Sequence, residues 1–570
     1  MSETFRAQID EYLADVRARQ AAVWPAEVPR EVTYPFAEET LTDYLRNWAK
    51  ARPDHPVIKF HGTSMTYAEL DELSDRVAAY LAHRGLQRGD RVAVMLPNVP
   101  QFIVVFFGIL KSGCVHVPVN PMFKRLEINH ELVDSSARLA FVLDDYAEEF
   151  IAAREGTALE SVVAMSVRDA LPGDLPLPRG AKDGVPPFPD AERLADVLAD
   201  DSLPVPEDPN DPDALAALNY TGGTTGLPKG CEHTQRDMVY TAVTAGQHNL
   251  DLDQDSVILM YLQIFWIAGE DGFLLTFACG GTCVLQYRWD PDEAAAAIER
   301  EGVTVFAGTV DNVLELLDSA KTSGRSLASL RTTVTMSFVT KLAEDIRERW
   351  ARESGSSAVL RESSYGMTED HTFDTFTRGL QPLDLSGRAG FVGLPMPETD
   401  IAVVDFETNE LVPIGEEGQI IVRSPSMMRA YHRRPDATAD TLRDGWLLTG
   451  DSGVIDENGC LHYLGRRKEM LKVNGMSVFP SELEFTLSRH PDVAASGVIG
   501  RPDEARGEIP LAFIELRPGS TLTAEELTAW CRTNMATYKI PAIRIIDEMP
   551  LAPTGKVSKL ALEKLAAEED

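Results

Sequence analysis

The 570-residue chain has few cysteines, a shortage of positive charge and no long apolar run. Its six cysteines form no CxxC pair and no Cys/His cluster with zinc spacing, which argues against a zinc site and indicates reduced thiols in a cytoplasmic protein. The 54 Lys and Arg residues against 89 Asp and Glu give a net charge of −35, which disfavours a nucleic-acid surface. The most apolar run, FIVVFFGIL at 102–110, is far shorter than the ~20 residues of a membrane span, so we expect a buried helix there.

The order of helix-like and strand-like segments predicts an α/β protein. From about residue 41, segments with helical periodicity such as TYAELDELSDRVAAYLAHRG alternate with short apolar runs such as DRVAVMLP, as in a parallel sheet covered by helices. We predict a large N-terminal domain at 1–464, with two parallel-rich sheets layered with helices and a small β-barrel-like subdomain at 393–464. A smaller, mobile α+β domain is predicted at 465–570.

A glycine-rich loop at 220–230, YTGGTTGLPKG, lies in a predicted phosphate-loop region at 213–235. Glycine permits the backbone angles that turn N–H groups toward an anion, and threonine hydroxyls and a lysine add donors. The loop is not a Walker A motif, because Pro228 precedes the lysine and a glycine follows it. We expect a polyphosphate site, the alternative being a flexible polar turn. Its predicted binding residues are Thr221, Gly222, Gly223, Thr224, Thr225, Gly226 and Lys229.

Further motifs accompany this loop in a fixed order. They are GCVHVPVNPMFKRLEINHEL at 113–132, SSYGMTED at 363–370, GWLLTGDSGVIDENGCLHYLGRRKEMLKVNGMSVFPSELE at 445–484 and PLAPTGKVSK at 550–559. Together they resemble the signatures of the adenylate-forming superfamily, which includes acyl-CoA synthetases, aryl-CoA ligases, luciferases and peptide-synthetase adenylation domains. The resemblance covers about residues 41–562.

The resemblance implies two half-reactions and three small molecules: ATP, Mg²⁺ and coenzyme A. A carboxylate first attacks the α-phosphate of ATP to give an acyl-adenylate and pyrophosphate. A thiol then displaces AMP and forms a thioester. The leading hypothesis is therefore an AMP-forming acid–thiol ligase that acts on a fatty or other apolar acid.

The resemblance also assigns roles to residues of this chain. Catalysis is expected of Lys556, Thr368 and Glu369, and magnesium binding of Glu369 with Thr221. The other residues expected to bind ATP or AMP are Tyr365, Gly366, Met367, Asp451 and Arg466. Lys468 is the expected hinge, and Lys472 and Gly475 are expected to face coenzyme A.

The chain departs from the family pattern around the expected acyl pocket. Trp266 stands where many relatives have histidine, after Phe265. In MSFVTKL at 336–342, Phe338 and Val339 replace two glycines of a common Ser-Gly-Gly-Ala-Pro-Leu loop, and Ser364 replaces a small glycine. We assign Phe265, Trp266, Phe338 and Ser364 to this pocket. Glu270 and Asp271 nearby disfavour a dianionic acid unless a cation intervenes.

Two alternatives stay open from the sequence. The first is a biosynthetic adenylating enzyme whose acceptor is a carrier-protein thiol or an amine, or which activates an unusual oxyanion. The second is a non-catalytic nucleotide-binding homologue, since fold alone does not grant activity. No nucleic acid and no membrane span are expected, and a homodimer is possible.

Overall fold

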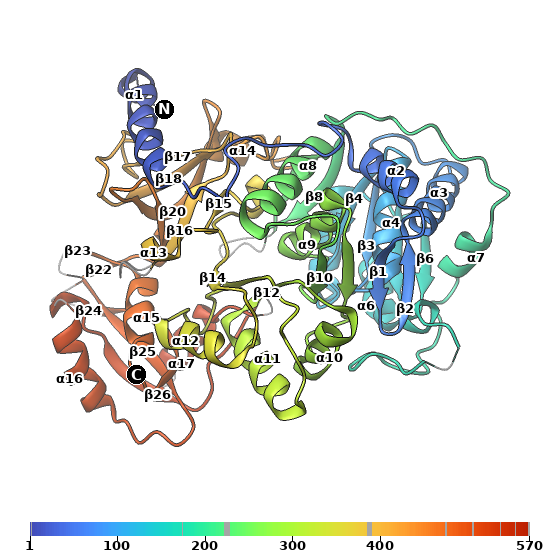
Figure 1. The fold of residues 1–570 in the computed structure, drawn as a ribbon. Coiled ribbons are helices and arrows are strands. Elements are labelled where there is room, and N and C mark those ends of the chain that lie inside the picture. Colours follow the sequence, from blue (N-terminus) through green and yellow to red (C-terminus); the bar gives the residue numbers. More distant parts are fainter. Residues whose placement is uncertain are drawn as a thin grey trace.

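The computed structural model describes residues 1, 3–173, 175–221, 228–384, 390–473, 476–503, 507–535, 537–552 and 555–567. It confirms an α/β architecture with two parallel-rich sheets, an antiparallel sheet and a separate C-terminal unit (Figure 1). Within the described ranges, no helix combines the length and the hydropathy that crossing a membrane requires.

The first parallel-rich sheet has the strand order β14-β13-β12-β10-β11-β1-β2, and only the β1–β2 pairing is antiparallel among the described strands. Its strands are β1 (Pro56–Phe60), β2 (Thr63–Thr66), β10 (Val257–Met260), β11 (Thr282–Leu285), β12 (Val305–Thr309), β13 (Thr332–Met336) and β14 (Leu360–Glu362). The end of β13 leads directly into the 336–342 loop.

The second parallel-rich sheet has the order β7-β6-β5-β3-β4-β8-β9. Its strands are β3 (Arg91–Met95), β4 (Val115–Pro118), β5 (Leu139–Leu143), β6 (Ser161–Met165), β7 (Glu192–Arg193), β8 (Leu215–Tyr220) and β9 (Gly230–Thr234). The helices around these two sheets are α2 (Leu41–Ala51), α3 (Tyr67–His83), α4 (Pro100–Lys111), α5 (Arg125–Ser135), α6 (Ala147–Ala153), α7 (Leu194–Ala199), α8 (Gln235–Thr244), α9 (Ile267–Cys279), α10 (Pro291–Glu301), α11 (Val310–Ser323) and α12 (Glu344–Glu353). The short helix α13 (Gln381–Asp384) comes later in the chain.

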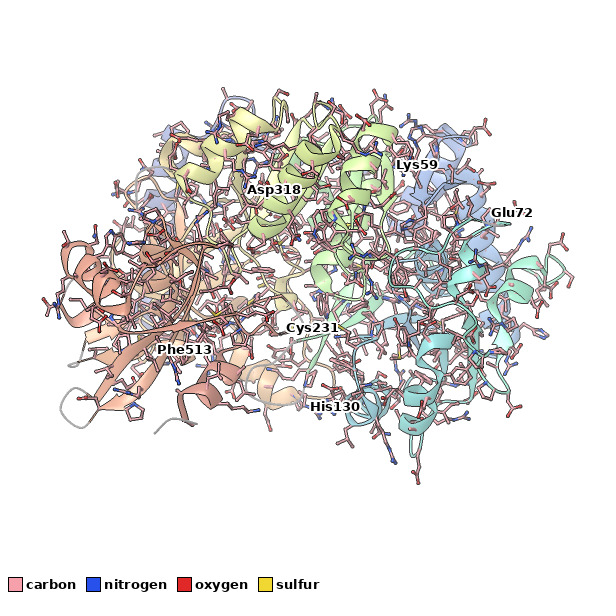
Figure 2. All side chains as sticks on the ribbon, turned by 90° about the horizontal axis from the view of Figure 1, so that it is seen from below. Lys59, Glu72, His130, Cys231, Asp318 and Phe513 are labelled. Carbon is pink, nitrogen blue, oxygen red and sulfur yellow. The ribbon has the colours of Figure 1, made fainter. Side chains whose placement is uncertain are left out.

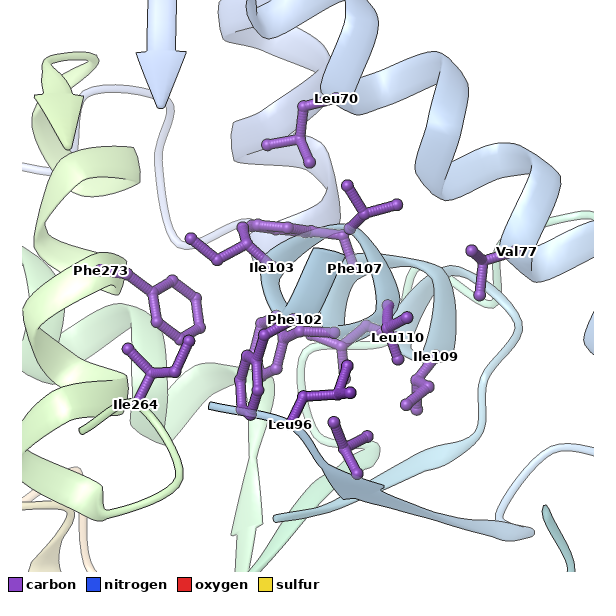
Figure 3. Packing of buried hydrophobic residues seen from close by; sticks show 14 of the residues in the cluster. Leu70, Val77, Leu96, Phe102, Ile103, Phe107, Ile109, Leu110, Ile264 and Phe273 are labelled. Atoms are coloured by element: carbon purple, nitrogen blue, oxygen red, sulfur yellow. The ribbon is translucent and has the colours of Figure 1, made fainter. Parts of the chain in front are cut away.

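Local sequence signals explain where several helices begin. Thr66 caps α3 by accepting from the backbone N–H of Glu69, whose carboxylate accepts from the Thr66 N–H in return. Such reciprocal caps satisfy donors that have no partner in the first helical turn. The apolar run at 102–110 forms the body of α4 and is fully buried, as predicted. Figure 3 shows Phe102 and Phe107 of α4 packed between α3 and the helix that carries Phe273.

The antiparallel sheet runs in the order β15-β16-β21-β20-β18-β17, with β19 paired to β20. Its strands are β15 (Thr375–Phe376), β16 (Phe391–Pro395), β17 (Asp400–Val404), β18 (Gly418–Arg423), β19 (Leu442–Arg443), β20 (Trp446–Ile455) and β21 (Leu461–Arg466), and α14 (Pro435–Thr441) lies beside it. The N-terminal helix α1 (Glu3–Val23) packs Phe5 edge-on against Trp446 of this sheet. Figure 1 shows α1 against β17 and β18, far from the other N-terminal elements.

The C-terminal unit is a small sheet with the order β23-β22-β25-β24, extended by β26 beside β25. Its elements are β22 (Leu471–Val473), β23 (Met476–Val478), α15 (Pro480–Ser488), β24 (Val493–Asp503), β25 (Gly507–Leu516), α16 (Ala524–Asn534), β26 (Ala542–Ile546) and α17 (Lys559–Ala567). Between this unit and the N-terminal elements lies a cavity of about 550 Å³, lined on one side by α12 and on the other by α15.

The structure corrects one detail around the glycine-rich loop. The sequence suggested that a helix follows the loop, but β9 intervenes and pairs antiparallel with β8. In the sequence, HTQRDMVYTAVTAGQ at 233–247 looks helical, but its first two residues end β9 and α8 begins at Gln235. A five-residue strand is too short to show its alternation clearly. The loop therefore connects two strands of a hairpin.

Candidate active site

The two ends of the glycine-rich loop lie together at the tip of this hairpin. The Thr221 N–H donates to the Lys229 carbonyl at 3.0 Å, and the Lys229 N–H lies 3.4 Å from the Thr221 hydroxyl. The His130 Nε2–H donates to the Pro228 carbonyl at 2.9 Å; Figure 2 labels His130 and, on β9, Cys231. Five residues predicted to bind phosphate, Gly222, Gly223, Thr224, Thr225 and Gly226, lie outside the described residues.

Lys229 and Glu369 meet through Tyr431. The Lys229 ammonium lies 3.7 Å from the centre of the Tyr431 ring, a cation–π contact. The Tyr431 hydroxyl donates to Glu369 Oε1 at 2.6 Å. Tyr431 is placed by the pairing of the 429–432 segment with β9, in which Tyr431 stands opposite Cys231. Burial and the Glu369 carboxylate both raise the pKa of Tyr431, so its hydroxyl stays a donor.

The segment with Thr368 and Glu369 is a tight turn at Thr368–Asp370 that is fixed from several sides. The His233 Nε2–H donates to the Thr368 carbonyl at 2.7 Å, and the Met428 N–H donates to the Glu369 carbonyl at 2.8 Å. The Met367 N–H donates to Asp370 Oδ1 at 2.8 Å. Because both neighbouring carbonyls are held, the turn presents the Thr368 and Glu369 side chains in a fixed direction.

Gly366 permits a close approach in the same segment. A Cβ at this position would lie 2.5 Å from the backbone nitrogen of Phe373 and 2.7 Å from the Cα of Thr372. Real Cβ atoms do not come that close to backbone, so a side chain here would push the 365–373 segment apart. The glycine is therefore required by packing within the turn.

Asp451 joins Tyr365 and Arg466. The Tyr365 hydroxyl donates to Asp451 Oδ2 at 2.8 Å, and Arg466 Nε lies 2.9 Å from Oδ1. Asp451 and Arg466 are cross-strand partners on β20 and β21, which sets their distance. Burial raises the pKa of Asp451, while Arg466 opposes that shift. A buried carboxylate held by a phenol and a guanidinium suits the recognition of a pair of hydroxyls.

Lys556 reaches this group from the C-terminal unit. The residue lies in a turn in which the Ala552 N–H donates to the Lys556 carbonyl at 2.7 Å. Its ammonium lies 5.0 Å from the centre of the Phe338 ring. Lys556 is exposed to solvent. Desolvation and the nearby Arg466 lower the pKa of Lys556, and the Asp451 carboxylate opposes them.

The predicted hinge and coenzyme-A residues are described only in part. Lys468 lies in the 3₁₀ turn Arg467–Glu469, and Lys472 lies on β22, but their side chains are not among those described. Gly475 lies outside the described residues.

The residues assigned to the acyl pocket fall into two places. Phe265 is buried beside Trp266, with ring centres 5.2 Å apart, at the start of α9. Phe338 lies instead against Lys556, and within the described part of the chain no ring contact joins it to Trp266. Ser364 precedes Tyr365 and is half-buried. A pocket shared by these four residues therefore stays a prediction.

Glu270 and Asp271 are fully buried and both face His371, whose single positive charge balances one of their two negative charges. His371 Nδ1 lies 2.9 Å from Asp271 Oδ1, and His371 Nε2 lies 3.7 Å from Glu270 Oε1. Burial by itself lowers the pKa of His371, but the two carboxylates raise it to about 10. The intervening cation that the sequence left open is thus the imidazolium of His371. Asn219 donates to Glu270 Oε2 at 3.0 Å.

The oxygen donors near the loop fit a magnesium ion. Mg²⁺ prefers hard oxygen ligands and is held in nucleotide sites by one or two carboxylates together with phosphate oxygens. Glu369 is half-buried beside the loop, and Tyr431 occupies only its Oε1 among the described hydrogen bonds. Thr221, with its hydroxyl at the loop base, is a second oxygen donor.

Sequence reasoning missed Tyr431, His233 and His371. Tyr431 follows the strand β18 by eight residues in a stretch without helical or strand periodicity, so pattern analysis gave no signal for it. His371 directly follows the SSYGMTED motif, and its nearness to a quoted motif was a signal that could have been used. All three act on the site through neighbours that are far away in sequence.

Comparisons with known proteins identify the family of this chain. The family model for the AMP-binding enzyme matches residues 45–432, and the model for the AMP-binding enzyme C-terminal domain matches residues 482–556. The long-chain-fatty-acid–CoA ligase of Bacillus subtilis (strain 168) is 30% identical over 559 residues, 95% of this chain and 97% of the relative. The feruloyl-CoA synthase of an Amycolatopsis species is 31% identical over 516 residues, 90% of this chain and 96% of the relative.

A solved structure shares the fold over nearly the whole chain. The anthranilate CoA ligase AuaEII in complex with anthranoyl-AMP has a TM-score of 0.79 and 27% identity, covering 93% of this chain and 98% of that structure. The family models, the full-length relatives and the fold all agree with the family that the motifs indicate. The chain therefore belongs to the AMP-binding enzyme family, as an ATP-dependent acyl-CoA ligase of the adenylate-forming superfamily.

Proposed function

We propose that the protein activates a fatty or other apolar carboxylic acid as its acyl-adenylate at the Asp451 site and then transfers the acyl group to coenzyme A. The observation that carries this proposal is the convergence of Lys556, from the C-terminal unit, on Asp451 and Arg466 of the N-terminal domain. A cation delivered by one domain to a nucleotide site on another suits a reaction between two anions, the carboxylate and the α-phosphate.

Each residue at the site has a role in this scheme. Asp451 accepts the ribose hydroxyls, and Arg466 holds the carboxylate charged and in place. Tyr365 flanks the adenine, and Met367 and Gly366 shape the turn beneath it. The loop from Thr221 to Lys229 holds the β- and γ-phosphates, and Thr368 donates to the α-phosphate. Lys556 stabilises the charge that develops as the carboxylate oxygen attacks phosphorus.

Glu369 and Thr221 would hold Mg²⁺, which supplies positive charge to the phosphates when it is bound. Tyr431 keeps the Glu369 carboxylate oriented through its 2.6 Å hydrogen bond, and the same ring contacts Lys229. One side chain thus sets the positions of both the magnesium ligand and the loop lysine.

The second half-reaction requires Lys556 to withdraw. We infer that the C-terminal domain rotates about Lys468 and presents the segment from Lys472 to Gly475 to coenzyme A. The cavity of about 550 Å³ between α12 and α15 indicates that the two domains are not tightly packed over their whole contact. Such a contact is compatible with domain rotation.

The acid is proposed to be apolar on two grounds. Phe265 and Trp266, at the start of α9, offer aromatic surface, and the curated relatives act on fatty and aromatic acids by their names.

The proposal can be tested with the purified chain. It is incubated with ATP, Mg²⁺ and a panel of acids that differ in chain length and in ring content. Release of AMP and pyrophosphate is measured with and without coenzyme A, and products are identified by mass. We expect acyl-CoA with an apolar acid, and acyl-AMP retained without coenzyme A. Acyl-AMP formation with no thioester at any coenzyme A concentration would contradict the transfer to coenzyme A. No AMP from any acid would refute adenylation.

Replacement of Asp451 by asparagine is expected to raise the KM for ATP by about ten- to hundredfold, because a charge-assisted hydrogen bond is worth roughly 1.5–3 kcal/mol. The turnover at saturating ATP should change less, since the contact is made equally in ground and transition states. Steady-state kinetics at varied ATP measure both. Asp440→Asn, on the exposed surface of α14, is the matched control. An unchanged KM would rule out ribose recognition by Asp451.

A further inference from the structure

The loop at 336–342 departs from the family pattern, and its substituted residues contact the C-terminal unit. The loop follows β13 and is anchored to the N-terminal domain by Ser337. The Ser337 hydroxyl donates to Glu362 Oε2 at 2.6 Å, and the Ser337 N–H donates to Oε1 at 3.0 Å. Beyond this anchor, the residues from Phe338 to Lys341 stand where the family pattern has Gly-Gly-Ala-Pro.

The aromatic ring of Phe338 faces the ammonium group of Lys556. Its ring centre lies 5.0 Å from the ammonium, within the range of a cation–π attraction. A glycine at this position would leave the ammonium without that partner. The next residue, Val339, packs against an apolar cluster of the C-terminal unit that includes Phe513, Met549 and Leu562 (Phe513 is labelled in Figure 2).

Thr340 and Lys341 each make one polar contact within the N-terminal domain and one with the C-terminal unit. The Thr340 hydroxyl donates to Asp311 at 2.5 Å and lies 3.5 Å from the Ala494 carbonyl. The Lys341 ammonium donates to the Ser337 carbonyl at 3.0 Å and lies 4.0 Å from Glu484 Oε2 on α15. The Lys341 ammonium group therefore makes a hydrogen bond within its own loop and also an ion pair with the C-terminal unit.

Glu484, the partner of Lys341, is itself fixed in place by other contacts. The carboxylate is buried, accepts the Val498 N–H at 2.9 Å and pairs with Lys559 at the start of α17. Lys559 lies three residues after Lys556. A contact at Glu484 is thus linked by a short, hydrogen-bonded segment to the turn that carries Lys556.

We propose that Phe338 and Lys341 are positioning residues that hold the C-terminal domain in the orientation that places Lys556 at the nucleotide. This inference rests on the proposed role of Lys556 in adenylation. In this arrangement the bulky loop is a docking element between domains, and its effect is confined to the first half-reaction. The thioester-forming half-reaction, which requires another domain orientation, does not depend on these contacts.

The first test separates the two half-reactions in the full-length chain. Phe338→Leu keeps apolar bulk but removes the ring, and Lys341→Met keeps length but removes the charge. Each is expected to slow ATP–pyrophosphate exchange by about three- to tenfold, with the KM values for ATP and acid unchanged. Thioester formation from supplied acyl-adenylate and coenzyme A should be equal or faster. Lys321→Met, on the exposed face of α11, is the control and should leave both rates unchanged.

Other outcomes overturn the inference. Equal slowing of both half-reactions would indicate general damage to the fold, and raised KM values would place the loop in a substrate pocket instead. Thermal unfolding of each variant, compared with Lys321→Met, shows whether the fold is retained. If both variants exchange pyrophosphate at the wild-type rate, the loop does not position Lys556.

A second test uses the Lys556→Ala background. If Phe338 and Lys341 act through Lys556, adding either substitution to Lys556→Ala should slow adenylation no further. A further slowing by the full factor would overturn the inference while leaving the role of Lys556 intact. If Lys556→Ala alone adenylates at the wild-type rate, the proposed role of Lys556 fails, and the positioning inference fails with it.

Discussion

Replacement of Lys556 by alanine is expected to slow acyl-adenylate formation by about 10²- to 10³-fold, the usual cost of losing a donor aimed at developing transition-state charge. The structure places this ammonium near Asp451 and Arg466, with desolvation and Arg466 lowering its pKa. ATP–pyrophosphate exchange measures this half-reaction directly. Because Lys556 is expected to withdraw before thioester formation, the conversion of supplied acyl-adenylate to acyl-CoA should be nearly normal in the variant.

A matched control is available on the same domain. Lys564 is an exposed lysine of α17, so Lys564→Ala should leave both half-reactions and thermal unfolding unchanged. Lys556→Ala itself should unfold at the wild-type temperature, because its turn is held by backbone hydrogen bonds. Near-normal pyrophosphate exchange in a folded Lys556→Ala variant would contradict the proposed mechanism.

The second large effect is expected at His371, whose loss should destabilise the fold by about 3–5 kcal/mol, because an ion pair that loses one partner leaves a buried charge uncompensated. His371→Asn removes the cation between Glu270 and Asp271. Asparagine is the suitable replacement, because His371 has a positive φ of 57° and Asn tolerates that region. Thermal unfolding should show a large loss relative to His83→Asn, an exposed control on α3.

Removing the buried acids should recover part of that loss. The triple variant Glu270→Gln, Asp271→Asn, His371→Asn carries no buried charge at this cluster, so it should unfold at a higher temperature than His371→Asn alone. If His371→Asn is as stable as the wild type, the cluster does not hold the imidazolium that its geometry indicates. Folded His371→Asn should also show a lower kcat/KM for ATP. The ring of His371 packs against His233, and His233 donates a hydrogen bond to the Thr368 carbonyl.

The same cluster gives stability a pH dependence of known sign. The pKa of His371 is about 10 in the folded state and ordinarily about 6.5, so its contribution is complete below pH ~6.5 and is lost as pH rises through ~10. Burial also raises the pKa of Asp271 to about 6. The folded state therefore binds this proton more tightly than the unfolded state, which adds stability below pH ~4, and this added stability is lost as the pH rises to ~6. The stability difference between wild type and His371→Asn should therefore shrink between pH 7 and pH 10. Thermal unfolding across this range measures it, and a constant difference would contradict it.

Much of the local structure was predictable from short patterns. The capping pair Thr66 and Glu69 marks the start of α3, Thr523 and Glu526 mark the start of α16, and the apolar run at 102–110 forms a buried helix. These signals involve residues within one or a few helical turns of each other, so residues that are close in the sequence are enough to show them. Strand β9 was missed because five residues between a loop and a helix give too little alternation to distinguish them.

The motifs selected residues without showing how they meet. They identified Asp451, Arg466 and Lys556, but the sequence did not show that a tyrosine at 431 would join Lys229 to Glu369. Nor did it show that Glu270 and Asp271 have a histidine cation between them. The motifs also gave no sign that the ring of Phe338 would lie 5.0 Å from the Lys556 ammonium.

The sequence by itself determined the family and most of the order of helices and strands, and it predicted the residues of the nucleotide site. Contiguous motifs and short periodic patterns carry this information. Only the tertiary structure decided which side chains share a site. The contacts between Tyr431 and Lys229, between His371 and Asp271, and between Lys341 and Glu484 join residues that are about 100 or more positions apart. Such contacts depend on how sheets and domains pack, and no local pattern records that packing.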